Sequence, residues 1–152
     1  MMVIQRTNSL NPDFKALVAL LDNELKITDG EKFPFFSQFN TLTDIQHVLV
    51  AYDENQTAVG CGALKAYDSE TVEVKRMYVL PTYRRKKVAM QILQMLEHWA
   101  KEMQYKRCIL ETGILQTAAI RLYEQSNFVR TENYGQYEGV AESVCFEKKL
   151  YL

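Results

Sequence analysis

The segment from Thr71 to Thr112 limits the possible folds more than any other part of the chain. A strand-like run at 71–79 is followed by Pro81, by a long helical pattern and by a short apolar run centred on residues 108–110. Within the helical pattern, apolar residues recur at intervals of three and four from Val88 to Met103. Two strands joined by such a crossover helix pair in parallel. The sequence therefore predicts a parallel strand pair, 71–79 with about 106–112.

The residues before this segment predict antiparallel neighbours. Strand-like runs at 47–53 and 58–67 are connected to each other and to 71–79 by short polar turns. Short turns between adjacent strands indicate an antiparallel meander. Further upstream, residues 2–7 are typical of a strand. Asn11-Pro12 is typical of a helix start, and we expect 27–43 to be irregular and aromatic.

The remaining elements complete a mixed fold. A helix is expected over about 116–126, ended by Asn127 in a left-handed conformation, and a last strand over 143–150. The predicted order is β-α-(α)-β-β-β-α-β-α-β. The fold class is therefore α/β of the mixed α+β kind, with a mostly antiparallel central sheet and flanking helices. A length of 152 residues suits one domain, 1–152.

Composition excludes several classes of function. The formal net charge is -1, so the chain is no polycation, and we expect no nucleic-acid partner. No apolar stretch has the length of a signal peptide or membrane span, so no membrane association is expected. The three cysteines are odd in number and lack CxxC or metal-ligand spacing. They predict buried free thiols, a cytoplasmic location and no metal site.

Four consecutive cations, residues 84–87, stand where the long helix is expected to begin. A helix N-terminus carries partial positive charge, so this position disfavours cations. A bound anion would resolve the conflict, because free N–H groups and basic side chains both bind phosphate oxygens. The alternatives are a solvated basic patch and a weak nucleic-acid patch.

The strand before these cations contains a second irregularity. Its alternation fails at Lys75-Arg76, where two charged residues are adjacent. A β-bulge would relieve this conflict and would splay the end of the strand. Splayed parallel strands leave unpaired backbone groups, which an extended ligand can use.

Two motifs resemble those of the GNAT family of N-acetyltransferases. Residues 72–89, VEVKRMYVLPTYRRKKVA, resemble its acetyl-CoA motif, a strand followed by Arg/Gln-x-x-Gly-x-Gly/Ala at a helix start. Arg84 and Ala89 fill the first and last positions, and Lys87 replaces the central glycine. Residues 119–128, AIRLYEQSNF, resemble the second signature, Ala-x-x-Leu-Tyr-x-x-x-Gly-Phe. The resemblance covers about residues 44–150 and suggests a small, single-domain member of the bacterial type.

The resemblance implies an acyl-CoA N-acyltransferase fold and an acetyl-CoA donor. It implies direct transfer of acetyl to a primary amine of an unidentified small molecule or peptide within a ternary complex, by a monomer or homodimer. The alternative is a non-catalytic acyl-CoA-binding sensor, because the motif glycine is absent. The implied cofactor contacts are the strand residues Met77, Tyr78 and Val79, and the diphosphate contacts Arg84, Arg85, Lys86, Lys87, Val88 and Ala89.

Tyr123 corresponds to the tyrosine of the second signature, which implies a donor to the departing thiolate. The alternative is a core aromatic residue. Glu73, upstream on the bulged strand, is the first candidate for the general base, and Glu111 on the next strand is the second. For Glu73 the alternative is a solvent-facing residue paired with Lys75.

Aromatic residues are the candidates for the acceptor pocket. They cluster in two segments that flank the acceptor cleft in related folds, and they are Phe33, Phe35 and Phe36 in the first segment and Tyr134 and Tyr137 in the second. The alternative is that they close a core. Gly135 and Gly139 suggest a mobile loop around 133–141.

Overall fold

The computed structural model describes residues 2–39 and 45–151. Its strands are β1 (Val3–Thr7), β2 (His47–Tyr52), β3 (Ala58–Ala66), β4 (Thr71–Val79), β5 (Arg107–Gly113), β6 (Val129–Thr131) and β7 (Ser143–Lys149). Its α-helices are α1 (Pro12–Asp29), α2 (Phe33–Ser37), α3 (Val88–Glu102) and α4 (Thr117–Gln125). Three short 3-10 helices are η1 (Gly30–Lys32), η2 (Pro81–Tyr83) and η3 (Gly135–Tyr137).

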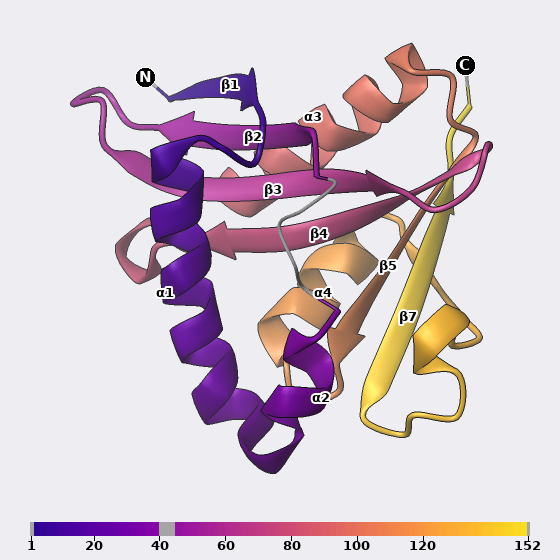
Figure 1. Cartoon of the computed structure of the whole chain (residues 1–152). Coiled ribbons are helices and arrows are strands. Elements are labelled where there is room, and N and C mark those ends of the chain that lie inside the picture. The colour runs from indigo at the N-terminus through magenta and orange to yellow at the C-terminus, as the bar shows by residue number, and fades with distance from the viewer. Residues whose placement is uncertain (1, 40–44, 152) are drawn as a thin grey trace.

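The strands form one seven-stranded sheet in the order β1-β2-β3-β4-β5-β7-β6 (Figure 1). All neighbours are antiparallel except β4 and β5, which are parallel. This pair is short, since 71–73 faces 107–109 and the two strands then diverge. The predicted fold class, including the splayed parallel pair, is confirmed.

The expected bulge lies in β4. Cys61 faces Tyr78 while Ala63 faces Lys75, so β4 contains an extra residue between these pairs. The residue in the left-handed region is Arg76, with φ 58°. Because of the extra residue, two consecutive side chains turn to the face of the sheet that α1 covers. Arg76 reaches Asp22 on α1, and Lys75 reaches the carbonyl of Phe39.

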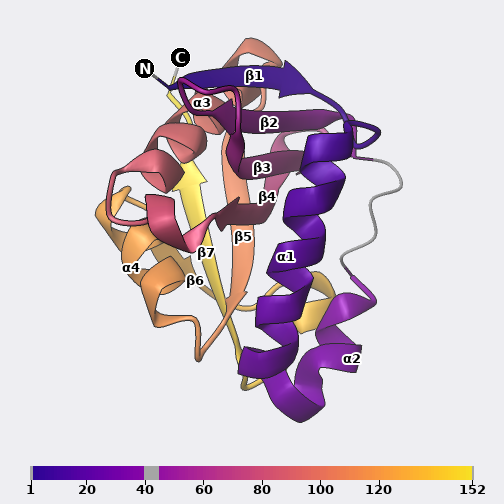
Figure 2. The same cartoon turned by 90° about the vertical axis from the view of Figure 1, so that its left-hand side faces the viewer.

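Helices cover both faces of the sheet (Figure 2). On one face α1 packs Phe14, Leu17 and Val18 against β2 and β3. On the other face α3 and α4 cover the larger core cluster. The N-terminus of α1 is capped as expected, because the Asn11 side chain accepts hydrogen bonds from the N–H groups of residues 13 and 14. No helix in the described ranges is long and apolar enough to cross a membrane.

The structure corrects three expectations about the elements. Residues 27–39 are mostly helical, because α1 continues to Asp29 and is followed by η1 and α2; residues 40–44 of the predicted irregular segment lie outside the described residues. The short strand β6 was not predicted. Met95, assigned to the core face of α3, is 38% exposed, and Leu93 is buried instead.

Candidate active site

A cleft of about 140 Å³ opens where β4 and β5 diverge. Its walls come from α1, α2, β4, β5, η3 and α4. Six residues singled out in the sequence line it: Phe36, Glu73, Met77, Glu111, Tyr123 and Tyr137. The fold therefore brings together both candidate bases and the signature tyrosine.

Tyr123 reaches the cleft from α4. Its ring makes an edge-on contact with Phe128 and a tilted contact with Phe146, both at 5.9 Å between centroids. Burial raises the pKa of the Tyr123 hydroxyl above its ordinary value. The hydroxyl is therefore protonated at neutral pH and can donate a hydrogen bond. Asn127, with φ 69°, provides the expected left-handed residue after α4.

Glu73 is buried, so the alternative was wrong in expecting a solvent-facing residue, although its expected pairing with Lys75 is present. Its carboxylate accepts a hydrogen bond of 2.5 Å from the Tyr134 hydroxyl and lies 3.9 Å from the ammonium of Lys75. Lys75 also donates to the Phe39 carbonyl at 2.9 Å, and burial lowers the pKa of its ammonium. Glu73 thus has two partners within the protein: the ammonium of Lys75, which has the opposite charge, and the hydroxyl of Tyr134, which donates a hydrogen bond.

Glu111, the second candidate base, lines the cleft from β5. Burial raises the pKa of its carboxyl from 4.5 to about 7, although a hydrogen bond from Ser143 opposes this shift. The Ser143 hydroxyl donates to Glu111 at 2.7 Å. Glu111 is therefore divided between its protonated and ionised forms near neutral pH, which is where a general base works best.

The four cations do not open a helix. They form the turn between η2 and α3, and α3 begins only at Val88. Arg85 and Lys87 both have φ 64°, in the left-handed region. Lys87 therefore does not have a helical backbone conformation. Lys87 has the backbone conformation that glycine adopts most easily, at the position where the resembling motif has glycine.

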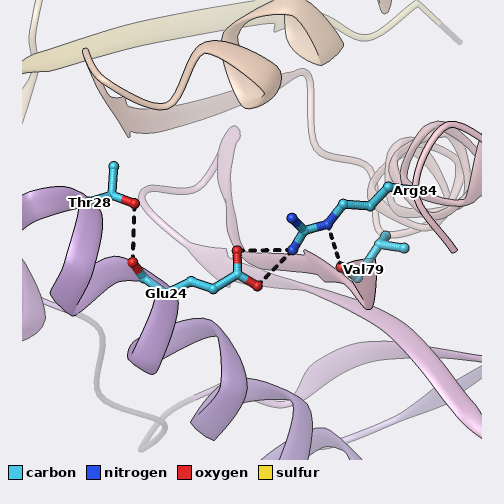
Figure 3. A network of polar contacts seen from close by, with 4 residues as sticks. All are labelled: Glu24, Thr28, Val79 and Arg84. Carbon is cyan, nitrogen blue, oxygen red and sulfur yellow. Dashed lines mark hydrogen bonds and ion pairs between the residues drawn. The ribbon is translucent and has the colours of Figure 1, made fainter. Parts of the chain in front are cut away.

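Arg84 joins this turn to α1 (Figure 3). Its Nε donates to the Val79 carbonyl at 2.9 Å, and one terminal nitrogen lies 2.8 and 3.0 Å from the two carboxylate oxygens of Glu24. Within α1, the hydroxyl of Thr28 donates to the Glu24 carbonyl. The Arg84 side chain, expected near a diphosphate, thus binds Glu24 here.

The Val79 carbonyl is directed into the gap between the diverging strands β4 and β5. The N–H of the next residue, Leu80, donates to Val59 on β3. Successive residues of a strand direct their backbone groups to opposite sides, so Val79 and, two residues earlier, Met77 direct theirs away from β3. This edge of β4 can therefore pair with an extended chain.

A model of the acetyltransferase (GNAT) family matches residues 13–128. The chain belongs to the GNAT family. It is 33% identical to the IAA acetyltransferase of Azospirillum brasilense, with 97% of each chain aligned. A Klebsiella pneumoniae protein described as an acyl-CoA N-acyltransferase superposes with a TM-score of 0.84, 29% identity and 99% coverage of both chains. A GNAT acetyltransferase from Elizabethkingia anophelis, solved with acetyl-CoA bound, gives a TM-score of 0.72 at 21% identity over 98% of both chains.

Membership of the GNAT family confirms the prediction of an acyltransferase. Three aromatic candidates do not line the cleft. The Phe33 ring centroid lies 5.7 Å from the ammonium of Lys26, Phe35 packs edge-on against Phe36 and Phe39, and Tyr134 contacts Glu73 from the η3 loop. The cysteines are free and buried, as predicted, at positions 61, 108 and 145. Among the described residues, no group of three or more His, Cys, Asp and Glu is arranged to hold a metal.

Sequence reasoning missed several residues that line the cleft of this GNAT protein. They are Leu21, Leu25, Asp29, Lys75, Arg76 and Gln116. The doublet Lys75-Arg76 carried a signal, but only for a bulge. The α1 residues gave no separate signal, because apolar residues at helical spacing are equally typical of a core.

Proposed function

We propose that this GNAT protein transfers acetyl from acetyl-CoA to the primary amine of a small molecule or peptide, by direct attack in a ternary complex. The observation that carries the proposal is that a neutral tyrosine, Tyr123, and a carboxyl that titrates near neutrality, Glu111, line one cleft at the divergence of β4 and β5. The acetyl-CoA bound in the Elizabethkingia anophelis structure supports the choice of donor.

The residues present suit acetyl-CoA. The first turn of α3 has no acidic residue, and its N–H groups follow a turn that contains Arg85, Lys86 and Lys87. Helix N-termini and cations both favour phosphate. We assign the diphosphate to the backbone of 84–89. The extended arm of the cofactor would follow β4 at Met77, Tyr78 and Val79, along the edge that faces away from β3 and where Arg84 now contacts the Val79 carbonyl. When bound, the cofactor supplies an activated acetyl thioester.

We assign proton acceptance to Glu111 rather than to Glu73, the choice favoured by sequence. Glu73 already accepts from Tyr134 and lies beside Lys75, so both of its carboxylate oxygens have partners within the protein. Glu111 takes a proton from the substrate ammonium, directly or through water, and the free amine then attacks the thioester carbon, from which the CoA thiolate departs. Its pKa of about 7 makes the ionised form available at neutral pH.

Tyr123 completes the assignment as hydrogen-bond donor to the departing sulfur. Its hydroxyl has no tendency to ionise at neutral pH, and its ring is fixed by Phe128 and Phe146. A fixed donor aimed at developing negative charge lowers the barrier without reorganisation.

The test is release of free thiol from acetyl-CoA in the presence of a panel of primary amines, with the acetylated amine identified by mass spectrometry. We expect release that depends on the amine and falls in Glu111→Gln. Acetyl-CoA binding without release for every class of amine would contradict the proposal.

A further inference from the structure

We infer that the acceptor carries a carboxylate beside its amine, and that Arg76 binds this carboxylate. The inference rests on the proposed function and narrows its substrate to amino-acid-like amines. It starts from one side chain in the cleft whose hydrogen bonding is incomplete.

Arg76 is a buried cation with an unused donor. Its side chain is 2% exposed, and one terminal nitrogen donates to Asp22 at 2.6 Å. Its Nε–H is buried and, within the described part of the chain, has no acceptor. An unsatisfied buried donor destabilises the folded state. A contact that served only to attach α1 to the sheet would not require a buried donor without an acceptor.

The unused donor has the geometry of carboxylate recognition. A guanidinium binds a carboxylate best through two parallel N–H groups, and Nε shares one edge with a terminal nitrogen. Asp22 contacts Nη2, the terminal nitrogen on the same edge as Nε, and leaves Nε without a partner, so a ligand carboxylate on this edge would displace Asp22 or share Nη2 with it. The Asp22 side chain is 38% exposed, so water can solvate its carboxylate when a second carboxylate approaches the guanidinium.

The bulge in β4 is a second, independent observation. It places Arg76 on the same face as Lys75, and both line the cleft. The cost is a left-handed backbone at a non-glycine residue, φ 58°. Such strain is typical of functional sites. Glu73 offsets the charge of Lys75, and the bulge makes the Arg76 guanidinium part of the cleft wall.

The rest of the cleft fits the other parts of such a substrate. Glu111, on β5, suits the amine. Leu21, Leu25 and Phe36 supply an apolar wall from α1 and α2. An α-amino acid with an apolar side chain combines all three features: an amine, a carboxylate and an apolar body.

The test compares pairs in which the carboxylate is replaced by a carboxamide: leucine, methionine and phenylalanine, each against its amide, at equal concentrations of the free amine. We expect the wild type to favour at least one acid over its amide by about tenfold or more in kcat/KM. Arg76→Gln should abolish this ratio while retaining acetylation of the amide, and Asp22→Asn should keep or increase it. The exposed Arg121→Gln is the matched control and should leave the ratio unchanged.

Binding separates this inference from the proposed function. Calorimetric titration of each acid and amide in the presence of CoA needs no turnover, and the same preference is expected there. If Arg76→Gln misfolds, the double variant Asp22→Asn/Arg76→Gln, which removes both charges of the buried pair, is used in its place in both experiments. The absence of an acid preference in every pair, or its persistence without Arg76, would overturn the inference even if amides are acetylated.

Discussion

The hydroxyl of Tyr123 is buried among aromatic rings and lines the cleft, so its removal tests one hydrogen bond with little change in packing. We expect Tyr123→Phe to lower kcat by about tenfold to a hundredfold, because a donor to developing charge is lost. Acetyl-CoA affinity should stay the same. Steady-state kinetics and calorimetry measure both, with the exposed Tyr151→Phe as control. An unchanged kcat, with chemistry rate-limiting, would remove this role.

Glu111 links activity and stability to pH. Its folded pKa is raised from 4.5 to about 7, so the folded state binds the proton more tightly than the unfolded state. Its contribution is therefore complete below about pH 4.5 and is lost as pH rises to about 7. Glu111→Gln should thus gain stability relative to wild type across this window, by about 3 kcal/mol at pH 8.

Denaturant unfolding at pH 5 and pH 8 measures the Glu111 effect. The exposed Glu124→Gln is the control and should show no such difference between the two pH values. The gain in stability should accompany a loss of activity. If Glu111→Gln were equally destabilised at both pH values, the raised pKa would be refuted.

Lys87 tests the left-handed turn before α3. A non-glycine residue at φ 64° has a strained backbone, so Lys87→Gly should raise the free energy of unfolding by roughly 0.5–1 kcal/mol. Lys86 is not among the positive-φ residues, so Lys86→Gly should lower that free energy. Denaturant unfolding of both variants measures the difference. Equal losses of stability would contradict the left-handed conformation at Lys87.

At the scale of elements, the contact between α1 and the turn before α3 is a polar one. Arg84 contacts Glu24 at the surface, where an ion pair contributes about 0–1 kcal/mol. Glu24→Gln should free Arg84 for the diphosphate and tighten acetyl-CoA binding by up to about fivefold at low salt. Glu31→Gln, on exposed η1, is the matched control. Weaker binding in Glu24→Gln would show that the ion pair supports the ligand-bound form instead.

The elements also show what sequence can predict. Thr71–Val79 was predicted to the residue, since its ends are marked by a polar turn and a proline. The bulge followed from one failed alternation. The helix α2 was missed because five residues are too few to show a period, and the start of α3 was misplaced because basic residues rarely adopt the left-handed backbone of Arg85 and Lys87.

The candidate site, too, was only partly predictable from the sequence. Tyr123, Glu73 and Glu111 were found because they belong to motifs or strand ends. The ranking of the two carboxylates as candidate bases was not predictable, since it depends on tertiary partners. Glu73 is contacted by Tyr134 from the loop at η3, and Glu111 by Ser143 from β7. Likewise, the contact of Arg84 with Glu24 joins positions 60 residues apart in the sequence.

At the scale of the whole molecule, the two proposed ligand sites meet where β4 leaves β5. One face of the sheet, under α1 and α2, provides the cleft with Glu111 and Arg76. The start of α3, on the other face, provides the turn of cations. The diverging strands connect the two faces, so a thioester bound along β4 would present its acetyl group to the cleft.

Calorimetric titration of acetyl-CoA at low ionic strength tests this arrangement most directly, with wild type beside Arg85→Glu/Lys87→Glu. The account predicts saturable binding by the wild type that weakens with salt and falls at least about tenfold in the double variant. No detectable binding by the folded wild type, or equal affinity in both proteins, would contradict a diphosphate at the start of α3.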